Sequence, residues 1–398
     1  MPRRLPFLVD GIETDVDRRF LDHFVYELSG VLTIHDDDSN PFKDLLLPMA
    51  TQHSGLMHSL MALSGSHIIA KEPNPEFKDR QFYHYSVAIS TLNANITSAI
   101  QSDQEASALL VEDPAVASTI VHCLISICSG STNGDYRIHM NGARSLIAKR
   151  DKRKSKNPEF QRFIMEFFMY HDVLNSLTSL DRRPQNLDDD DDRSLPNFLI
   201  HPAIQSGAGL MIPVLDGLFK YITRITALRD SVRRRIGAGL EPAVVYESLA
   251  QAVMIDAGIR DWDPHQESNT PLWVAAQLYR QCTWVYLYRT IQASRTSPKI
   301  CAAVDDGLDY LRVLTPTESV QCVLLLPIFL LGCAAFEKRQ RPDLETAFDN
   351  LQAYSNLGNI RPARQVVRRV WEMMDDGDEK SWDWEGIMAS MGIDVLVT

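Results

Sequence analysis

Apolar residues recur along almost the whole chain at spacings of three, four and seven residues, and this periodicity limits the possible folds most strongly. Such spacing gathers apolar side chains on one face of an α-helix, whereas the period-two alternation of half-buried strands is scarce here. We therefore expect an all-α protein, a large assembly of antiparallel helix pairs with about 12 to 15 helices and no substantial sheet. The expected helices occupy about residues 16–32, 41–51, 54–71, 75–102, 114–130, 136–150, 157–180, 213–236, 241–260, 271–294, 298–313, 316–336, 342–356 and 361–375.

Capping residues mark the starts of several of these helices. Four of them combine a capping side chain with a proline whose missing N–H costs nothing in the first turn: Asn40-Pro41, Asn157-Pro158, Thr270-Pro271 and Thr315-Pro316.

The longest gap between expected helices is 181–212, which contains five consecutive aspartates at 188–192. Adjacent carboxylates repel one another and bury no apolar surface, so we expect an acidic, solvated loop between an N-terminal helical half, 1–180, and a C-terminal half, 213–398. We expect both halves to belong to one continuous domain. The aspartates lack the spaced ligands of a calcium loop, and we expect no metal site.

Composition argues against several classes of protein. The chain has 398 residues with 45% hydrophobic residues, too many for wholesale disorder, and its net charge of −12 opposes attraction to nucleic-acid phosphate. Six cysteines form no C-x2-C pair and are expected to be buried thiols. Neither a secretory signal nor a membrane span is visible. We therefore expect a protein that is not secreted, with no membrane and no direct nucleic acid among its partners.

Several segments, in this order, resemble one known family. They are Ser54 to Ala70, Tyr83 to Ile89, Tyr136 to Ala148, Phe168 to Leu174 and Leu326 to Ala335, followed by Arg341, Gly358-Asn359, Val366-Val367, Trp371, Trp384, Met388 and Gly392. Together they resemble the fungal-specific transcription factor domain, the helical domain of zinc binuclear cluster regulators. Each fragment alone is weak, and their order and spacing make the resemblance specific.

The resemblance implies a regulatory protein that acts by small-molecule sensing or protein–protein interaction, in the nucleus and in control of secondary metabolism. Its expected partners are a small apolar molecule or secondary metabolite, another transcription factor, or a second copy of the chain. Family members usually carry a six-cysteine module that binds two zinc ions and contacts DNA. The cysteines of this sequence form no such cluster, so we expect no DNA-binding module of its own.

A basic run offers a possible nuclear-import signal. It consists of Lys149, Arg150, Lys152, Arg153, Lys154 and Lys156. The alternative is that these cations lie at a helix C-terminus, where the helix dipole favours positive charge.

An enzyme is the alternative function. The sequence lacks nucleophile-elbow, phosphate-loop, metalloprotease and dinucleotide motifs. The remaining possibility is a cofactor-independent cyclase or isomerase, in the cytoplasm, that folds an apolar intermediate in a helical pocket, with no cofactor. Its candidate catalytic residues are His122, His139, Tyr170, His171 and Asp172.

Each candidate also has a structural interpretation. A partly buried histidine bonded to a backbone carbonyl is the commoner case, for His58 as for the others, and adjacent His171 and Asp172 point about 100° apart on a helix. The resemblance covers His139, Tyr170 and Asp172, which favours packing roles there. An enclosed pocket with His122, His139 or His171 pointing into it would favour the enzyme, whereas a filled core with an exposed apolar helical face would favour an interaction module.

Overall fold

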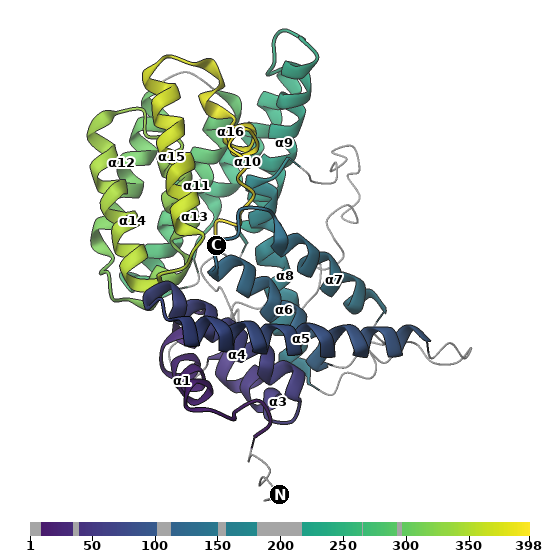
Figure 1. Cartoon of the computed structure of the whole chain (residues 1–398). Helices are drawn as coiled ribbons and strands as arrows, with labels where there is room; N and C mark the ends of the chain where they lie inside the picture. The colour runs from purple at the N-terminus through teal and green to yellow at the C-terminus, as the bar shows by residue number, and fades with distance from the viewer. Residues whose placement is uncertain are drawn as a thin grey trace, which may run out of the picture. The chain divides into compact units, whose positions relative to one another are not determined.

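The described part of the chain is helical. A computed structural model describes residues 9–34, 40–101, 113–149, 157–180, 217–264, 266–292 and 297–398, and these residues form no β-strand (Figure 1). The predicted all-α fold is confirmed. The chain divides into two compact units, the first made of residues up to Ile164 with Asn356–Asn359, the second of Met165–Ser355 and Ile360–Thr398. The predicted loop at 181–212 lies outside the described residues, and the division into halves there stays a prediction.

The first unit is built around one helix that is buried on nearly all sides. Its α-helices are α1 Asp15–His23, α2 Ser29–Val31, α3 Leu47–Ala50, α4 Ser54–Lys71, α5 Pro75–Gln101, α6 Asp113–Cys128, α7 Asp135–Lys149 and the first turns of α8 Pro158–Thr178, with π-helical segments at Phe24–Leu28 and Phe42–Leu46. Helix α4 contacts α1, α3, α5 and α6. Its residues 56–65 are all buried, as expected for a helix that is apolar or small-sided all round.

Small residues allow this close packing. A Cβ atom at Gly65 of α4 would lie 2.9 Å from side-chain atoms of both Phe20 and Gln81. The first unit contains a second such approach, where Gly358 N donates a hydrogen bond to Cys128 O over 2.9 Å. Gly130 there has φ of +70°, and its Cβ would lie 2.6 Å from Gly358 O, so a side chain at either glycine would separate the two backbones.

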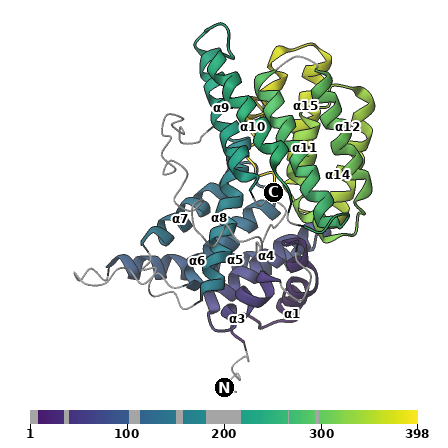
Figure 2. The same cartoon turned by 180° about the vertical axis from the view of Figure 1, so that it is seen from behind.

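The second unit is likewise organised around a central helix. Its later elements are α9 Phe219–Gly237, α10 Tyr246–Asp261, α11 Pro271–Ile291, α12 Pro298–Val313, α13 Leu325–Gly332, α14 Arg341–Ser355, α15 Ile360–Asp375 and α16 Trp384–Ser390, with 3-10 turns at Ser319–Val323, Lys338–Gln340 and Glu379–Trp382. Helix α11 contacts α9, α10, α12 and α13. Figures 1 and 2 show α11 to α15 as neighbouring helices.

The predicted helices agree with the structure except at 241–245, near residue 320 and at the C-terminus. The helix expected from residue 241 begins only at Tyr246. Asn40, Asn157 and Thr270 accept hydrogen bonds from first-turn N–H groups, as capping residues should. The single helix expected at 316–336 is instead a 3-10 turn followed by α13, because Pro327 fits the first turn of a helix and breaks its interior. The short helix α16 was not predicted.

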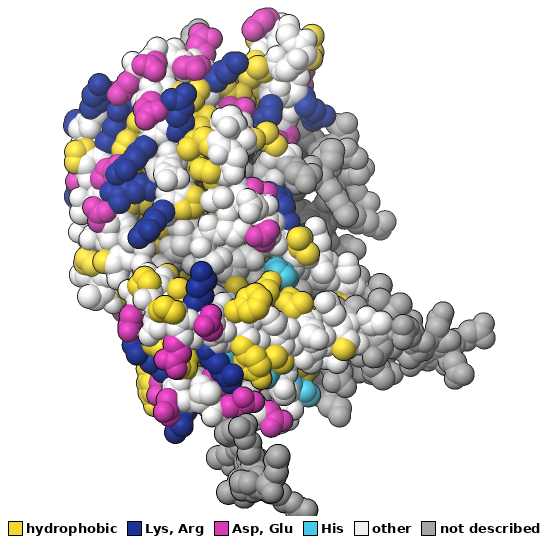
Figure 3. All heavy atoms as spheres, in the orientation of Figure 1, with side chains coloured by type: hydrophobic (Ala, Val, Ile, Leu, Met, Phe, Trp, Pro, Cys, Tyr) yellow, Lys and Arg dark blue, Asp and Glu magenta, His cyan; other side chains and the backbone are white. Residues whose placement is uncertain are grey.

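The surface of the second unit carries charges of both signs. On the face in Figure 3, Lys and Arg side chains lie beside Asp and Glu side chains over the second unit, where Arg364 and Arg368 both pair with Glu345. Within the part of the chain that the structure describes, no helix combines the length and apolar character needed to cross a bilayer.

Candidate functional site

Three pairs of histidine rings meet inside the first unit. The Nε2 atom of His23 lies 2.8 Å from Nδ1 of His67, and the Nδ1 atoms of His58 and His84 are also 2.8 Å apart. The rings of His122 and His139 stack with their centroids 5.4 Å apart. These pairs use six of the 11 histidines in the sequence.

The carboxylate of Asp17 anchors the second pair. It is fully buried in the first turn of α1 and accepts hydrogen bonds from Arg80 Nε over 2.6 Å and from His84 Nε2 over 2.8 Å. Burial opposes ionisation of Asp17. Hydrogen bonds from His84, Arg80 and the backbone N–H groups of Glu13 and Thr14 nevertheless hold its pKa well below the usual range.

The chain from Asp17 through His84 to His58 therefore links α1, α5 and α4 by buried hydrogen bonds. One of the two facing Nδ1 atoms donates a proton and the other accepts it. Burial, followed by the charge of His84, lowers the pKa of His58 to about 4. The cluster can hold a proton between two rings beside an ionised carboxylate, and it fixes three helices to one another.

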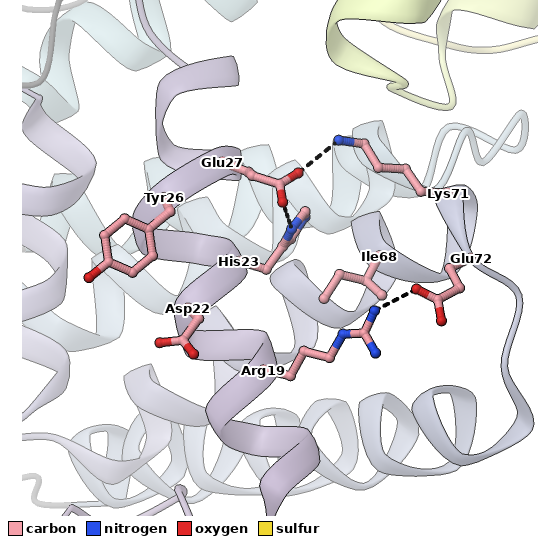
Figure 4. Close-up of a pocket in the computed structure, with 8 residues that line it drawn as sticks. All are labelled: Arg19, Asp22, His23, Tyr26, Glu27, Ile68, Lys71 and Glu72. Carbon is pink, nitrogen blue, oxygen red and sulfur yellow. Dashed lines mark hydrogen bonds and ion pairs between the residues drawn. The ribbon is translucent and has the colours of Figure 1, made fainter.

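The first pair borders a small pocket, shown in Figure 4. The pocket is open to solvent, has a volume of about 280 Å³ and is lined by Arg19, Asp22, His23, Tyr26, Glu27, Ile68, Lys71 and Glu72. Glu27 lies between His23, at 3.4 Å, and Lys71, at 3.1 Å, while Arg19 pairs with Glu72 at 2.5 Å. Burial lowers the pKa of His23 although Glu27 opposes this. Because most of the lining is charged, this pocket suits a polar ligand better than the apolar molecule expected from the sequence.

Two of the predicted catalytic residues, His122 and His139, lie together on α6 and α7. His122 is fully buried, and neither of its ring nitrogens has a hydrogen-bond partner. The ring of Tyr85 approaches His122 edge-on at 5.3 Å. Burial, followed by the charge of His139, lowers the pKa of His122 to about 3. His122 is therefore a neutral ring packed among aromatic side chains.

The other three candidates, Tyr170, His171 and Asp172, follow one another on α8 in the second unit. His171 Nδ1 donates to Phe167 O over 2.7 Å, and burial lowers the pKa of His171 to about 4. Burial raises the pKa of Tyr170, whose phenol is hydrogen-bonded with Thr398 and Tyr279. Asp172 is half-buried. These hydrogen bonds give Tyr170 and His171 structural roles, and a catalytic role for the three residues stays a prediction.

The basic run lies almost entirely outside the described residues. Lys149 ends α7, and residues 150–156 are not described. All six cysteines are free thiols, four buried and two half-buried. In the ranges that the structure describes, no group of three His, Cys, Asp or Glu side chains is placed to hold a metal ion.

The second unit contains a buried ionic cluster of another kind. Arg229 is fully buried and bonds both oxygens of Glu385, over 2.8 and 2.7 Å, between the indole rings of Trp382 and Trp384 at 4.6 and 3.9 Å. Arg233 Nη2 lies 2.9 Å from the same carboxylate. We call Arg229, Arg233 and Glu385 the arginine cluster. It ties α9 to α16.

The site residues that were not predicted from the sequence are Asp17, His23, His67, His84 and those of the arginine cluster. One local signal was available: Thr14 and Asp17 form a capping box at the start of α1, which marks Asp17 as ordered. The partners of these residues lie far away in sequence, and no local pattern identifies them.

Two comparisons with known proteins found a match. A family profile described as the fungal specific transcription factor domain matches residues 19–398. The transcriptional activator protein UGA3 of Saccharomyces cerevisiae is 23% identical over 419 residues, which cover 93% of this chain and 76% of that protein. No solved structure matches the chain.

Proposed function

The chain belongs to the fungal specific transcription factor domain family, and from this premise we propose that it regulates transcription through partners and small ligands rather than by direct contact with DNA. The profile match over residues 19–398 carries the regulatory part of this proposal. UGA3, to which the chain is similar, is named as a transcriptional activator. The net charge of −12 supports the absence of direct DNA contact, since it repels phosphate.

The pocket beside His23 is the proposed ligand site. A ligand there would touch α1, the π-helical segment after it and the end of α4, which are joined by the Glu27–Lys71 and Arg19–Glu72 ion pairs. A ligand that replaces either ion pair would favour one arrangement of these helices over another, and signalling requires such differential binding. The charged lining favours a polar molecule.

We further propose that the chain acts in the nucleus, that the run from Lys149 to Lys156 directs import, and that the regulated genes belong to secondary metabolism. The import proposal rests on six cations in eight residues. The proposal that the regulated genes belong to secondary metabolism rests on the family resemblance alone. A tagged chain with the run replaced by alanine is expected to lose nuclear accumulation, while the unchanged chain keeps it.

Deletion of the gene separates this function from the cyclase or isomerase alternative. Loss of a regulator lowers transcripts of its target genes. Loss of an enzyme leaves those transcripts intact, and its substrate accumulates. We expect lowered transcripts in the deletion strain and restored transcripts after complementation. Intact transcripts with an accumulating intermediate that the purified chain converts would contradict the proposal.

A further inference from the structure

The buried wall of the pocket beside His23 consists of two facing imidazole rings. His23 is 7% exposed, and its Nε2 atom lies 2.8 Å from Nδ1 of His67, which is fully buried on α4. Two nitrogens at this distance share one proton, which one ring donates and the other accepts. The second nitrogen of His23, Nδ1, faces Glu27 Oε1 at 3.4 Å. With His23 as the donor to His67, a further proton can therefore be added at Nδ1 while the two rings stay in contact.

Glu27 is shared between His23 and a lysine. Its Oε2 atom accepts a hydrogen bond from Lys71 Nζ over 3.1 Å, while its Oε1 atom faces the imidazole ring, as the dashed lines in Figure 4 show. Burial lowers the pKa of His23 most, Glu27 raises it, and the charges of Lys71 and then of Arg19 lower it further. Lys71 therefore holds the carboxylate that a protonated His23 needs.

The two ion pairs of the pocket are open to exchange with a ligand. The side chains of Lys71 and Glu27 are 36% and 56% exposed, and those of Arg19 and Glu72 are both 53% exposed. Ion pairs with this much exposure contribute little to stability. An ion from solution can therefore replace one member of such a pair at little cost.

His23 makes this exchange favour an anion over a cation. If an anion takes Lys71 away from Glu27, His23 can take up a proton and supply the missing positive charge. If a cation takes Glu27 away from Lys71, His23 has no negative charge to offer in return. An imidazole ring compensates only the first of these exchanges.

We propose that this pocket binds a ligand with a carboxylate or phosphate group on Lys71, and that His23 takes up one proton when the ligand binds. In the exchange, Lys71 Nζ leaves Glu27 for the ligand, a proton from solvent binds His23 Nδ1, and His23 then donates to Glu27 Oε1. The inference rests on the proposed function, which places the ligand in this pocket, and it names the charge of the ligand and the regulation of the site by pH.

Thermodynamic linkage gives the sign of the pH dependence. Because a proton enters with the anion, the affinity for the anion rises as the pH falls, and the bound anion makes His23 easier to protonate. The rise is confined to the interval between the lowered pKa of His23 in the free chain and its higher pKa in the complex. A cation that binds Glu27 would show the opposite dependence.

NMR of the full chain with 15N-labelled histidine measures both sides of this linkage. Sulfate is the probe for a phosphate group and formate the probe for a carboxylate, with chloride at equal ionic strength as the reference. We expect at least one probe to bind about threefold or more tightly at about pH 5.5 than at about pH 7.5. The same probe should protonate His23 at a pH where the ring stays neutral in chloride, and the preferred probe identifies the anionic group of the ligand.

Two histidine variants separate His23 from the general effect of pH on an acidic protein. His23→Gln keeps a donor and an acceptor without a titrating ring, so it should bind the probe with no rise in affinity at low pH. His53→Gln removes a half-buried histidine that precedes α4 and lies outside the pocket lining, and it should keep the rise of the wild type.

Two lysine variants test the exchange itself. Lys71→Gln should abolish binding of the probe and, with no probe present, make His23 easier to protonate, because Glu27 is then released to the ring. Lys78→Gln, at an exposed position of α5, should change neither property. Circular dichroism establishes that all four variants fold, and the titration of the wild type tests the linkage without any of them.

Three results would overturn the proposal: no binding of either probe, equal affinity at the two pH values, or a rise in affinity that His23→Gln leaves intact. The proposed function survives each of them, because a cation or an uncharged polar molecule in the pocket would still permit signalling. Deletion of the gene, which tests the proposed function, involves neither probe, so the two fail independently.

Discussion

In the first unit buried histidines lie around Asp17 and α4, whereas in the second unit buried arginines lie around Glu385. A histidine in an ordinary environment changes charge between pH 5 and 8. A buried histidine stays neutral, which lowers the stability of the folded chain as the pH falls. A guanidinium stays charged throughout this range. The first unit is therefore the part of the molecule whose stability should follow pH, and the second is the part whose stability depends on one permanent ion pair.

Glu385→Gln should have the largest effect, because it leaves Arg229 and Arg233 beside a neutral group in a buried site. We expect a loss of about 3 to 5 kcal/mol in unfolding free energy, the usual result of removing one partner of a buried pair. Glu372→Gln, which removes an exposed partner of Arg369, should cost less than about 1 kcal/mol. Urea denaturation of both variants measures the difference, and equal losses would contradict the account of the arginine cluster.

Asp17→Asn should have the second largest effect, a loss of about 2 to 3 kcal/mol in unfolding free energy, because Arg80 and His84 lose a charged acceptor. The carboxylate's pKa is depressed by folding, so its contribution is present above about pH 4 and disappears as the pH falls through the folded pKa. The variant should therefore differ least from the wild type in strong acid. Asp15→Asn, in the same turn but exposed, is the matched control and should be nearly neutral.

The pH dependence of the wild type separates the two units. His23, His58, His122 and His139 of the first unit all have lowered pKa values, and among the described histidines of the second unit only His171 does. Below about pH 6.5 the unfolded chain takes up protons that the folded chain does not, so stability is lost as the pH falls towards about 4. Each such histidine contributes a slope of at most about 1.4 kcal/mol per pH unit.

Hydrogen exchange at pH 7.5 and 5.5, corrected for the intrinsic rate, resolves this slope by region. Protection should fall more in α4 to α7 than in α11 to α15. An equal fall in both regions would mean that the buried histidines do not govern the acid response.

His122→Phe should have the smallest effect on the unfolding free energy, and any change should be an increase. Both ring nitrogens of His122 lack partners, and replacing a buried polar group without hydrogen bonds by an apolar ring is neutral or stabilising, by about 1 kcal/mol at most. His171→Phe, which removes a hydrogen bond to Phe167 O, should not stabilise. A destabilised His122→Phe variant would indicate a polar role for His122 that packing does not explain.

The same contrast shows how far sequence alone predicts this molecule. Helices α4 and α12 begin and end at the predicted residues, because the sequence signals that set a helix are local. The pairing of His23 with His67 and of His58 with His84 was not predicted, since the members of these two pairs lie 44 and 26 residues apart in the sequence. The helix expected at 241–260 has apolar residues on both sides, and only its packing on α9 and α11 decides which side is buried. Spacing therefore predicts the elements, and tertiary packing decides the sites.

The most direct measurement attaches the 398-residue chain to a reporter promoter through an unrelated DNA-binding module and follows reporter transcripts. A chain that regulates transcription should change transcript levels when it is tethered to the promoter, and the module alone should not. Unchanged transcripts from a folded tethered chain, together with conversion of an accumulated intermediate by the purified protein, would contradict a regulatory role.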